Sequence, residues 1–294
     1  MQLVAGSFSN NENFSAMKNR VKFALRGSLA LGSTLRWLQF LSEHGELLEL
    51  LRTHPRLAMK PHRPYLTKSM SIMDRVGILM SHYRLIKHLL HDSMYRQLLT
   101  GQTIHLAKLI GKNGKLYLVK LTRYLKFDRE GELSLLLTDQ DKTRLAIVTF
   151  VLYEYGGMPA ILIAGLQGPD VGCPHEAIKR TTKDFHGIFP KKLVMEALMT
   201  LSETLGIAHI HAISKEAHIY NLWRYRKQLR QFGADYNPFW RELGGTPIND
   251  ELYRLPGAIF HKPIEMVESK KRAEHRRRYA MLADLQVQIH SLAA

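Results

Sequence analysis

Cysteine is almost absent from this chain of 294 residues, because Cys173 is the only one. A single cysteine excludes an intramolecular disulfide framework and a cysteine-based metal site, and it fits a reducing compartment. Uninterrupted apolar runs of about 18 residues are also missing, so we expect no transmembrane helix. Residues 1–32 are basic and lack the apolar segment of a signal peptide. We therefore expect the protein to work in the cytoplasm, free or peripherally at the inner membrane.

Acidic residues are scarce relative to basic ones. The chain has 26 Asp and Glu against 42 Lys and Arg, a formal net charge of +16. The excess is densest at the two ends, with +8 over residues 1–100 and +3 over residues 262–294. Such a surface attracts an anionic membrane, an acidic carrier protein or nucleic acid through a field that salt screens. Because hydrophobic residues still make up 45% of the chain, it is expected to fold around a core.

The apolar pattern changes along the chain. Helical spacing predicts two helices at 31–51 and 70–99, joined by a proline-rich connector. Alternating and apolar runs then predict five strands in an antiparallel meander, at 103–110, 115–121, 132–137, 144–154 and 160–166. The Asn-Gly in Gly111–Gly114 indicates a hairpin between the first two strands.

The second half of the chain alternates helices and short strands. After a loop over 165–189, we expect a helix at 190–205, a strand at 208–214 and a helix at 219–231. A hairpin over 235–256 and a long basic helix over 264–290 follow. The predicted fold is α+β, with a mixed central sheet flanked by helices. We divide it into a helical region 1–101, a core 102–261 and a C-terminal helix 262–294 that packs on the core.

The stretch from Ile178 to Leu193 is rich in cations and stands before a helix start, where free N–H groups favour an anion. The same stretch also reads as a solvated loop, with glycine present only for its backbone freedom. Candidate ligands of a phosphate or pyrophosphate are Gln167, Gly168, Lys179, Arg180, Lys183, Gly187 and Lys191.

Two resemblances add to this interpretation. The succession of elements resembles the GNAT-type acyltransferase fold, in which a loop before a central helix holds the pyrophosphate of a thiol carrier. Several short motifs together resemble the VirK/YbjX family of Gram-negative bacteria: Gly165–Pro169, Thr182-Lys183, His186-Gly187, Pro190-Lys191, Asp235-Tyr236, Phe239-Trp240, Glu242–Gly245, Leu255-Pro256, Lys270–Ala273 and Arg276–Tyr279. The family resemblance implies an envelope and virulence setting with tolerance of cationic antimicrobial peptides. The fold resemblance implies acyl-CoA or acyl carrier protein as a donor.

Histidines are the candidates for proton transfer, because their pKa lies near neutral pH. In an acyl transfer, His186 or His218 would serve as the base and Tyr225 as the acid for the departing thiolate. With 15 histidines in the chain, a structural role for each remains the alternative. His209 and His211 share one face of a strand, but no further ligand stands at metal spacing, so no metal is expected.

The C-terminal helix begins with a dense group of cations. Each could contribute about 1 kcal/mol near an anionic leaflet. The candidate membrane or anion surface consists of Lys270, Lys271, Arg272, Arg276, Arg277 and Arg278. A solvated helix face is the alternative, and nucleic acid ranks lower because no recognition motif accompanies the charge. Two functions stay open: an acyltransferase-like enzyme acting on an envelope lipid or protein, and a non-catalytic accessory protein that binds anionic membrane or an envelope partner.

Overall fold

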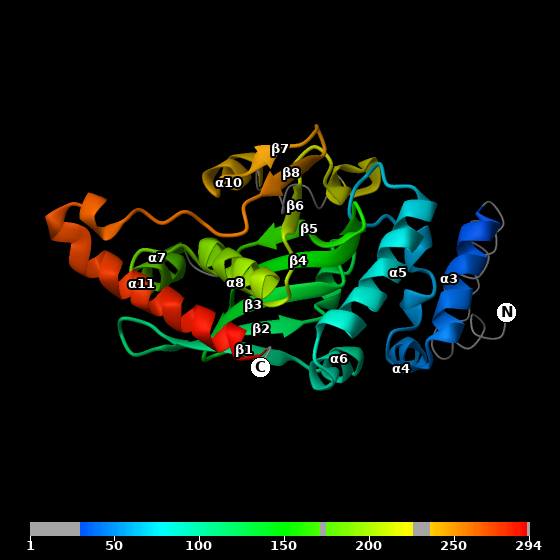
Figure 1. The fold of residues 1–294 in the computed structure, drawn as a ribbon, viewed down its shortest axis with the longest axis horizontal. Helices are drawn as coiled ribbons and strands as arrows, with labels where there is room; N and C mark the ends of the chain where they lie inside the picture. The colour runs from blue at the N-terminus through cyan, green and yellow to red at the C-terminus, as the bar shows by residue number, and fades with distance from the viewer. Residues whose placement is uncertain (1–29, 171–174, 226–235, 293–294) are drawn as a thin grey trace.

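A mixed sheet organises residues 30–170, 175–225 and 236–292, which are the residues that the computed structural model describes. Its eight described strands lie in the order β1-β2-β3-β4-β5-β6-β8-β7 (Figure 1). Their bounds are β1 Ile104–Ile110, β2 Leu116–Thr122, β3 Leu133–Asp139, β4 Arg144–Tyr155, β5 Met158–Gln167, β6 His209–Ile213, β7 Thr246–Pro247 and β8 Leu252–Leu255. The predicted meander is confirmed, because β1 to β5 pair antiparallel in chain order. The α+β class is confirmed as well.

Strands β5 and β6 form a parallel pair. Their pairing runs from Ala160 opposite His209 to Ile163 opposite Ala212, while β5 continues to Gln167. Strand β5 therefore extends beyond the carboxyl end of β6, which is at Ile213. In open sheets with parallel strands, ligands commonly bind outside such ends.

The N-terminal helices are shorter and more numerous than the apolar spacing predicted. They are α3 Leu31–Glu43, α4 Gly45–Thr53, α5 Ile72–Leu89 and α6 Asp92–Leu99, with 3-10 turns at Pro55–Leu57 and Lys60–His62. The first predicted helix is interrupted at His44, whose ring bonds back to the Phe40 carbonyl at 2.8 Å. The second restarts after His91, whose side chain caps α6. These helices stand together at one end of the molecule (Figure 1) and share one continuous core with the sheet.

The basic stretch before residue 190 is a helix, α7 His175–Asp184, where a loop was predicted. The Thr181 and Thr182 hydroxyls donate to carbonyls one turn earlier, at 2.9 and 2.8 Å, so these residues are compatible with the helix. Phe185 then anchors the end of α7 in the core. Helix α8, Pro190–Thr204, begins at the predicted proline.

Two further predictions were wrong. A helix was predicted over 219–231, but its described part, 219–225, forms two short 3-10 turns, Ile219–Asn221 and Trp223–Tyr225. Residues 226–235 lie outside the described ranges, as do 1–29 and Cys173. The aromatic stretch forms helix α10, Tyr236–Glu242, and only β7 and β8 make the hairpin. Tyr236 and Trp240 are four residues apart and both buried, which is the spacing of one helix face.

The last helix, α11 Ser269–His290, follows a 3-10 turn at Ile264–Met266 and starts later than predicted. Its second half packs on α8 and β1 through a buried apolar face: Met281, Leu282, Leu285 and Ile289. Its first half extends beyond the sheet (Figure 1). None of the described helices has the length and apolar character needed to cross a bilayer.

Candidate functional site

The turn between α7 and α8 has an unusual backbone. His186 and Gly187 both adopt positive φ values, 51° and 84°. Arg278 of α11 donates two hydrogen bonds to the His186 carbonyl, from Nε at 2.9 Å and Nη2 at 2.7 Å. A Cβ on Gly187 would lie 2.5 Å from Nη2 of Arg278, so this approach requires glycine. Arg278 thereby joins α11 to the turn.

A cavity of about 370 Å³ lies beside this turn, at the start of α8. Its lining comes from the turn, α8, α10, the segment after β8, and α11: Gly187, Ile188, Phe189, Lys191, Lys192, Glu196, Phe239, Glu242, His261 and Arg278. No side chain caps the α8 N-terminus, so its first N–H groups are available to an anion.

Lys191 is the most informative cation of this cavity. It is partly buried, and that burial lowers the pKa of its ammonium group. It forms no ion pair with any residue that the structure describes, whereas Lys192 lies 3.7 Å from Glu242. Its Cε would be 3.6 Å from a Cβ on Gly168, so the side chain reaches toward the end of β5. A cation without a counter-ion at a helix start is suited to holding a phosphate.

A histidine–carboxylate pair lies in the same cavity. His261 Nε2 is 3.0 Å from Glu196 Oε1, and the Glu196 side chain is only 8% exposed. The contact is an ion pair without hydrogen-bond geometry, since Glu196 Oε1 has no hydrogen-bond partner among the described residues. A carboxylate beside one ring nitrogen leaves the other nitrogen for proton transfer. Sequence reasoning missed both residues. The available signal was an acidic residue on the buried face of α8, between the core residues Leu193 and Ala197.

The predicted anion ligands divide into two groups. Gly187 and Lys191 line the cavity, and Gly168 lies beside Lys191. The side chains of Lys179, Arg180 and Lys183 are exposed on α7, and Lys179 pairs with Glu176 at 3.0 Å. These three do not line the cavity.

The predicted base His186 lies in the turn, outside the cavity lining. Burial and the nearby Arg277 lower the pKa of its imidazole. Its backbone carbonyl, held by Arg278, forms the contact that positions the turn.

His218 and Gln167 meet elsewhere, in a buried cluster at the carboxyl end of β5. Gln167 Nε2 donates to Glu130 Oε1 at 3.3 Å and to the Tyr236 hydroxyl at 2.9 Å. His218 Nε2 lies 3.4 Å from Glu130 Oε1. Burial raises the pKa of the Glu130 carboxyl, although His218 and Gln167 oppose that effect. The four side chains are less than 9% exposed.

Tyr225 belongs to the rim of this cluster. Its ring packs edge-on against Tyr220, with centroids 5.6 Å apart, and Tyr220 in turn contacts His218. The Tyr225 hydroxyl accepts a hydrogen bond from Arg129. The structure therefore brings His218, Gln167 and Tyr225 together, and none of the three lines the cavity that contains Lys191.

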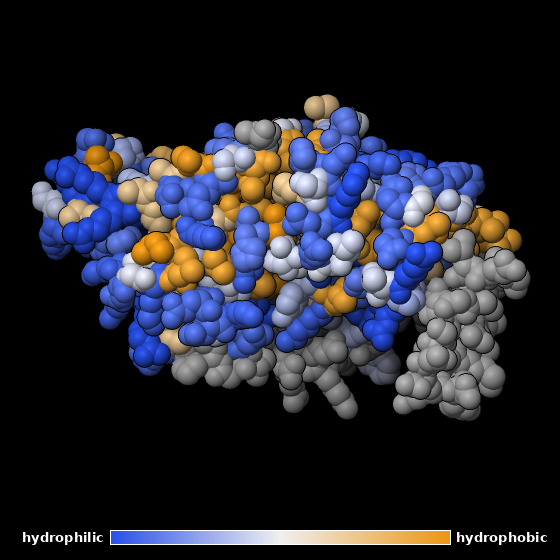
Figure 2. Space-filling view, turned by 90° about the horizontal axis from the view of Figure 1, so that it is seen from below, coloured by the Kyte–Doolittle hydropathy of each residue, from blue (hydrophilic) through white to orange (hydrophobic). Residues whose placement is uncertain are grey.

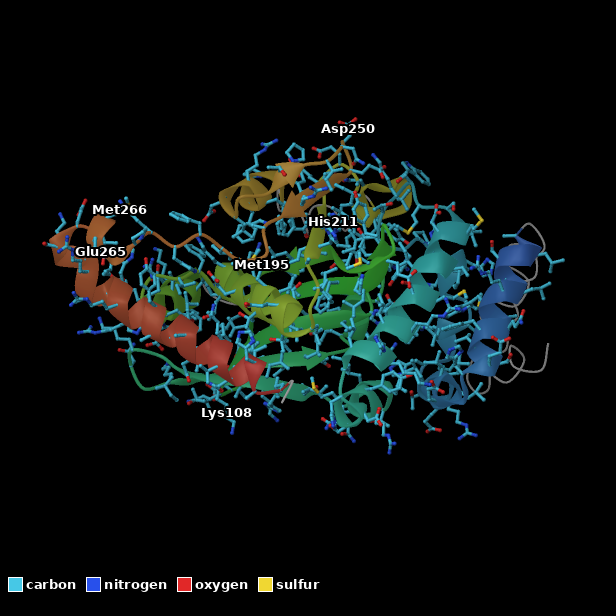
Figure 3. All side chains as sticks on the ribbon, in the orientation of Figure 1. Lys108, Met195, His211, Asp250, Glu265 and Met266 are labelled. Atoms are coloured by element: carbon cyan, nitrogen blue, oxygen red, sulfur yellow. The ribbon has the colours of Figure 1, made fainter. Side chains whose placement is uncertain are left out.

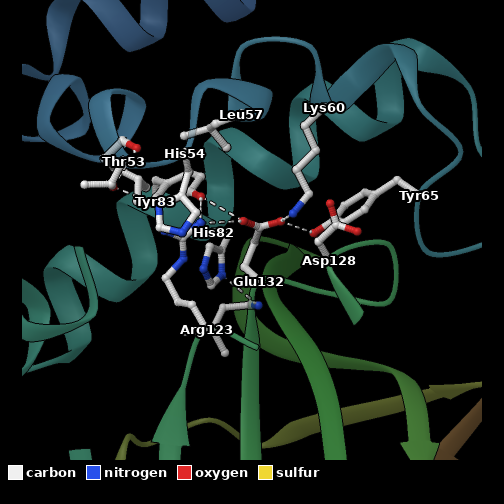
Figure 4. A network of polar contacts seen from close by, with 12 residues as sticks. Thr53, His54, Leu57, Lys60, Tyr65, His82, Tyr83, Arg123, Asp128 and Glu132 are labelled. Carbon is white, nitrogen blue, oxygen red and sulfur yellow. Dashed lines mark hydrogen bonds and ion pairs between the residues drawn. The ribbon is translucent and has the colours of Figure 1, made fainter. Parts of the chain in front are cut away.

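A second buried network joins the N-terminal helices to the sheet (Figure 4). The Glu132 carboxylate accepts hydrogen bonds from the hydroxyls of Tyr65 at 2.9 Å and Tyr83 at 2.7 Å. It also forms ion pairs with Lys60 and with Arg123, whose Nη2 is 3.7 Å away. Burial alone would raise the pKa of Glu132, but these two cations lower it to about 2. Its buried hydrogen-bond and ion-pair partners indicate a structural role.

The six cations predicted on α11 have different surroundings. Arg272 donates to the carbonyls of Val267 and Glu265, and Arg278 holds the turn, so both are bonded to backbone. Lys270 and Lys271 lie within 4 Å of Glu268, at 3.5 and 3.9 Å. Arg276 and Arg277 are exposed, and neither has an ion pair within the described ranges. In the same ranges, no group of three His, Cys, Asp or Glu side chains could hold a metal ion.

Comparison with known proteins identifies relatives along most of the chain. The uncharacterized protein YbjX of Escherichia coli K12 is 38% identical over 287 residues, which cover 98% of this chain and 86% of that protein. An uncharacterized protein of Haemophilus influenzae is 27% identical over 264 residues, 90% of this chain and 85% of the relative. The membrane protein LapB of Mannheimia haemolytica is 23% identical over 210 residues, 71% of this chain and 88% of the relative.

Among solved structures, a cAMP-binding acyltransferase from Mycobacterium smegmatis is similar over 77% of this chain, with 10% sequence identity and a TM-score of 0.30. The match covers 62% of the acyltransferase chain, which is less than two thirds of its length. That similarity is too low to support an argument. The model of a family described as "Protein of unknown function (DUF535)" matches residues 12–291. The predicted resemblance to YbjX is confirmed, and the chain belongs to the DUF535 family.

Proposed function

We propose that this protein transfers an acyl group from a phosphopantetheine thioester, carried by CoA or acyl carrier protein, to an amine or hydroxyl of an envelope lipid or protein. One observation carries the proposal. The cavity at the start of α8 combines Lys191, a cation with no ion pair among the described residues, with His261, an imidazole beside the Glu196 carboxylate. The first suits a phosphate and the second suits proton transfer.

The donor's phosphate arm binds at the start of α8. There the uncapped N–H groups and Lys191 both favour negative charge. The aromatic side chains Phe189 and Phe239 line the same cavity and offer apolar contact to the rest of the donor. The meander followed by α8 and the parallel strand β6, which prompted the acyltransferase hypothesis, supports this donor class.

His261 acts as the base in the proposed reaction, with the Glu196 carboxylate beside its ring. The acceptor's N–H or O–H loses its proton to His261 as its nitrogen or oxygen attacks the thioester carbonyl. A C–N or C–O bond forms, the C–S bond breaks, and the departing thiolate takes the proton back from His261. The reaction needs no oxidant and no additional reactant.

Binding is tested first, by calorimetry with CoA, acetyl-CoA, a long-chain acyl-CoA and acyl carrier protein. Lys191→Ala should weaken binding of a true donor at least tenfold, because one charge-assisted phosphate contact is lost. Lys179→Ala is the matched control, since this exposed lysine pairs with Glu176 outside the cavity. Absence of binding by every donor, or equal losses in the two variants, would overturn the proposed donor site.

Chemistry is tested separately, by release of free thiol from acyl-CoA in the presence of candidate acceptors. His261→Asn should abolish release while leaving CoA binding nearly unchanged, and His186→Ala should retain it. His218→Ala is expected to act through stability, since it opens the buried Glu130 cluster. Donor binding without thiol release from any acceptor would favour a non-catalytic accessory protein.

An envelope lipid or protein is proposed as the acceptor because the family resemblance implies an envelope setting. One relative bears the name membrane protein LapB, which supports an acceptor at a membrane.

A further inference from the structure

Two large apolar side chains are exposed on the segment that leads into α11. Phe260 and Met266 expose 80% and 66% of their surface. Phe260 precedes His261, which lines the cavity at the start of α8 together with the exposed Phe189. Met266 closes the 3-10 turn that contacts α11 and projects at this end (Figure 3). Single exposed apolar residues are ordinary, but several that protrude together mark an interaction site.

Cations are frequent in the same stretch of chain. Residues 260–278 contain seven Lys and Arg against three Glu, a net charge of +4 over that segment. Lys262, Arg276 and Arg277 are exposed, and none of them forms an ion pair within the described part of the chain. Seen from below, this end of the molecule is predominantly hydrophilic with apolar residues among the charged ones (Figure 2). We call Phe260, Met266, Lys262, Arg276 and Arg277 the basic end.

The basic end is held in place by backbone hydrogen bonds. Arg272 binds the carbonyls of Glu265 and Val267, and the Tyr279 hydroxyl donates to the Lys262 carbonyl. Val267 is buried, and its carbonyl is the one that accepts the Arg272 Nε hydrogen bond. The segment that bears Phe260 and Met266 is therefore tied to α11, and both side chains project into solvent from an ordered backbone. That preorganisation reduces the entropy lost on binding a partner.

We infer that the basic end docks on an anionic bilayer surface. Phe260 and Met266 enter the boundary between headgroups and acyl chains, and Lys262, Arg276 and Arg277 contact lipid phosphates. Protruding apolar side chains gain free energy when a lipid surface buries them, and cations gain it beside anionic headgroups. Nucleic acid would satisfy the cations but would leave Met266 in water. The inference is independent of the proposed acyl transfer.

The test is co-sedimentation of the full chain with vesicles of phosphatidylcholine alone or mixed with phosphatidylglycerol. Binding should require phosphatidylglycerol and weaken as salt is raised. Arg276→Ala with Arg277→Ala should weaken it roughly 30-fold, about 5-fold for each cation. Phe260→Ala with Met266→Ala should weaken it at both low and high salt, because that contribution is not screened.

Matched controls lie at the other end of the molecule. Arg36→Ala with Arg96→Ala removes two exposed cations from α3 and α6, and Leu31→Ala with Leu35→Ala removes two exposed leucines from α3. Both controls should bind vesicles like the unchanged protein. Equal binding to the two vesicle types would overturn the inference. So would equal losses in the controls, or binding to duplex DNA or RNA that competes with the vesicles and depends on Arg276 and Arg277.

Discussion

Arg278 and His186, separated by 92 residues in sequence, are joined by two hydrogen bonds from one guanidinium group to one carbonyl oxygen. The contact joins the last helix to the turn that precedes α8. It also helps to shape the cavity, because Arg278 and Gly187 both line it.

Replacing Arg278 by lysine keeps the charge but removes the paired donors. We expect Arg278→Lys to lower the free energy of unfolding by about 1–2 kcal/mol, since hydrogen bonds of a charged donor are lost. Urea denaturation followed by circular dichroism measures the change. Arg276→Lys, one exposed position on the same helix, should stay within about 0.5 kcal/mol. A similar loss in both variants would show that the guanidinium contact contributes nothing.

Gly187 is predicted to reject any side chain. Its φ of 84° is strained for other residues, and a Cβ would lie 2.5 Å from Arg278 Nη2. Gly187→Ala should therefore destabilise the protein by about 1–2 kcal/mol or more. Gly77→Ala is the control, because that glycine lies inside α5 with nothing within 4 Å of its Cβ position, and there alanine should stabilise by about 0.5–1 kcal/mol. Urea denaturation measures the change in the free energy of unfolding for both variants. A change of the same sign in the two variants would contradict the prediction.

Glu132 neutralises two buried cations, so removal of its charge alone should destabilise the folded state. Glu132→Gln should lower the free energy of unfolding by about 3–5 kcal/mol, because Lys60 and Arg123 remain buried without a carboxylate. Glu49→Gln breaks the exposed pair with Arg52 and should change stability by less than about 1 kcal/mol. Thermal unfolding of the two variants checks the difference, and a change below 1 kcal/mol for Glu132→Gln would contradict the structural role of the network.

Acid should destabilise the protein in two steps. Burial lowers the pKa of His82 from 6.5 to about 3, so the unfolded chain binds a proton there first and stability falls as the pH drops below 6.5. Glu132, lowered from 4.5 to about 2, keeps its charge in the folded state, so a second loss follows as the pH falls from 4.5 toward 2. Unfolding free energies measured by urea between pH 7 and 3 should decline throughout. A stability that stays constant from pH 6.5 to 4.5 would contradict the first step.

Lys191 should give the proposed donor site its own pH dependence. Phosphate binding requires the charged ammonium, so affinity is complete below the pKa of Lys191 and is lost as the pH rises through it. Because burial lowers that pKa, the loss should begin at lower pH than for an ordinary lysine at 10.5. Calorimetry with CoA between pH 7 and 10 measures it. Lys191→Arg, which stays charged, should bind with a flatter profile, and identical profiles would contradict the prediction.

Local pattern was sufficient for most of the sheet. The Asn-Gly hairpin, the meander and the proline-initiated helix α8 follow from residues close together in sequence, and the structure confirms all three. The errors occurred where local preferences were weak. Helix α7 contains two threonines and several cations, which resembled a solvated loop, and the buried Phe185 that anchors it could be recognised only from the packed structure.

The same distinction between local pattern and tertiary packing applies to the candidate site. The sequence by itself determined the family and the positive charge, and it predicted Lys191 and Gly187 as anion ligands, because those inferences depend on residue types at short spacing. Only the tertiary structure brought His261 to Glu196, Arg278 to His186 and His218 to Glu130. The two residues of each pair lie 65 to 92 residues apart in sequence. The distance between their side chains depends on how the helices pack against the sheet. No local pattern encodes such a distance, since it results from burial of the whole core.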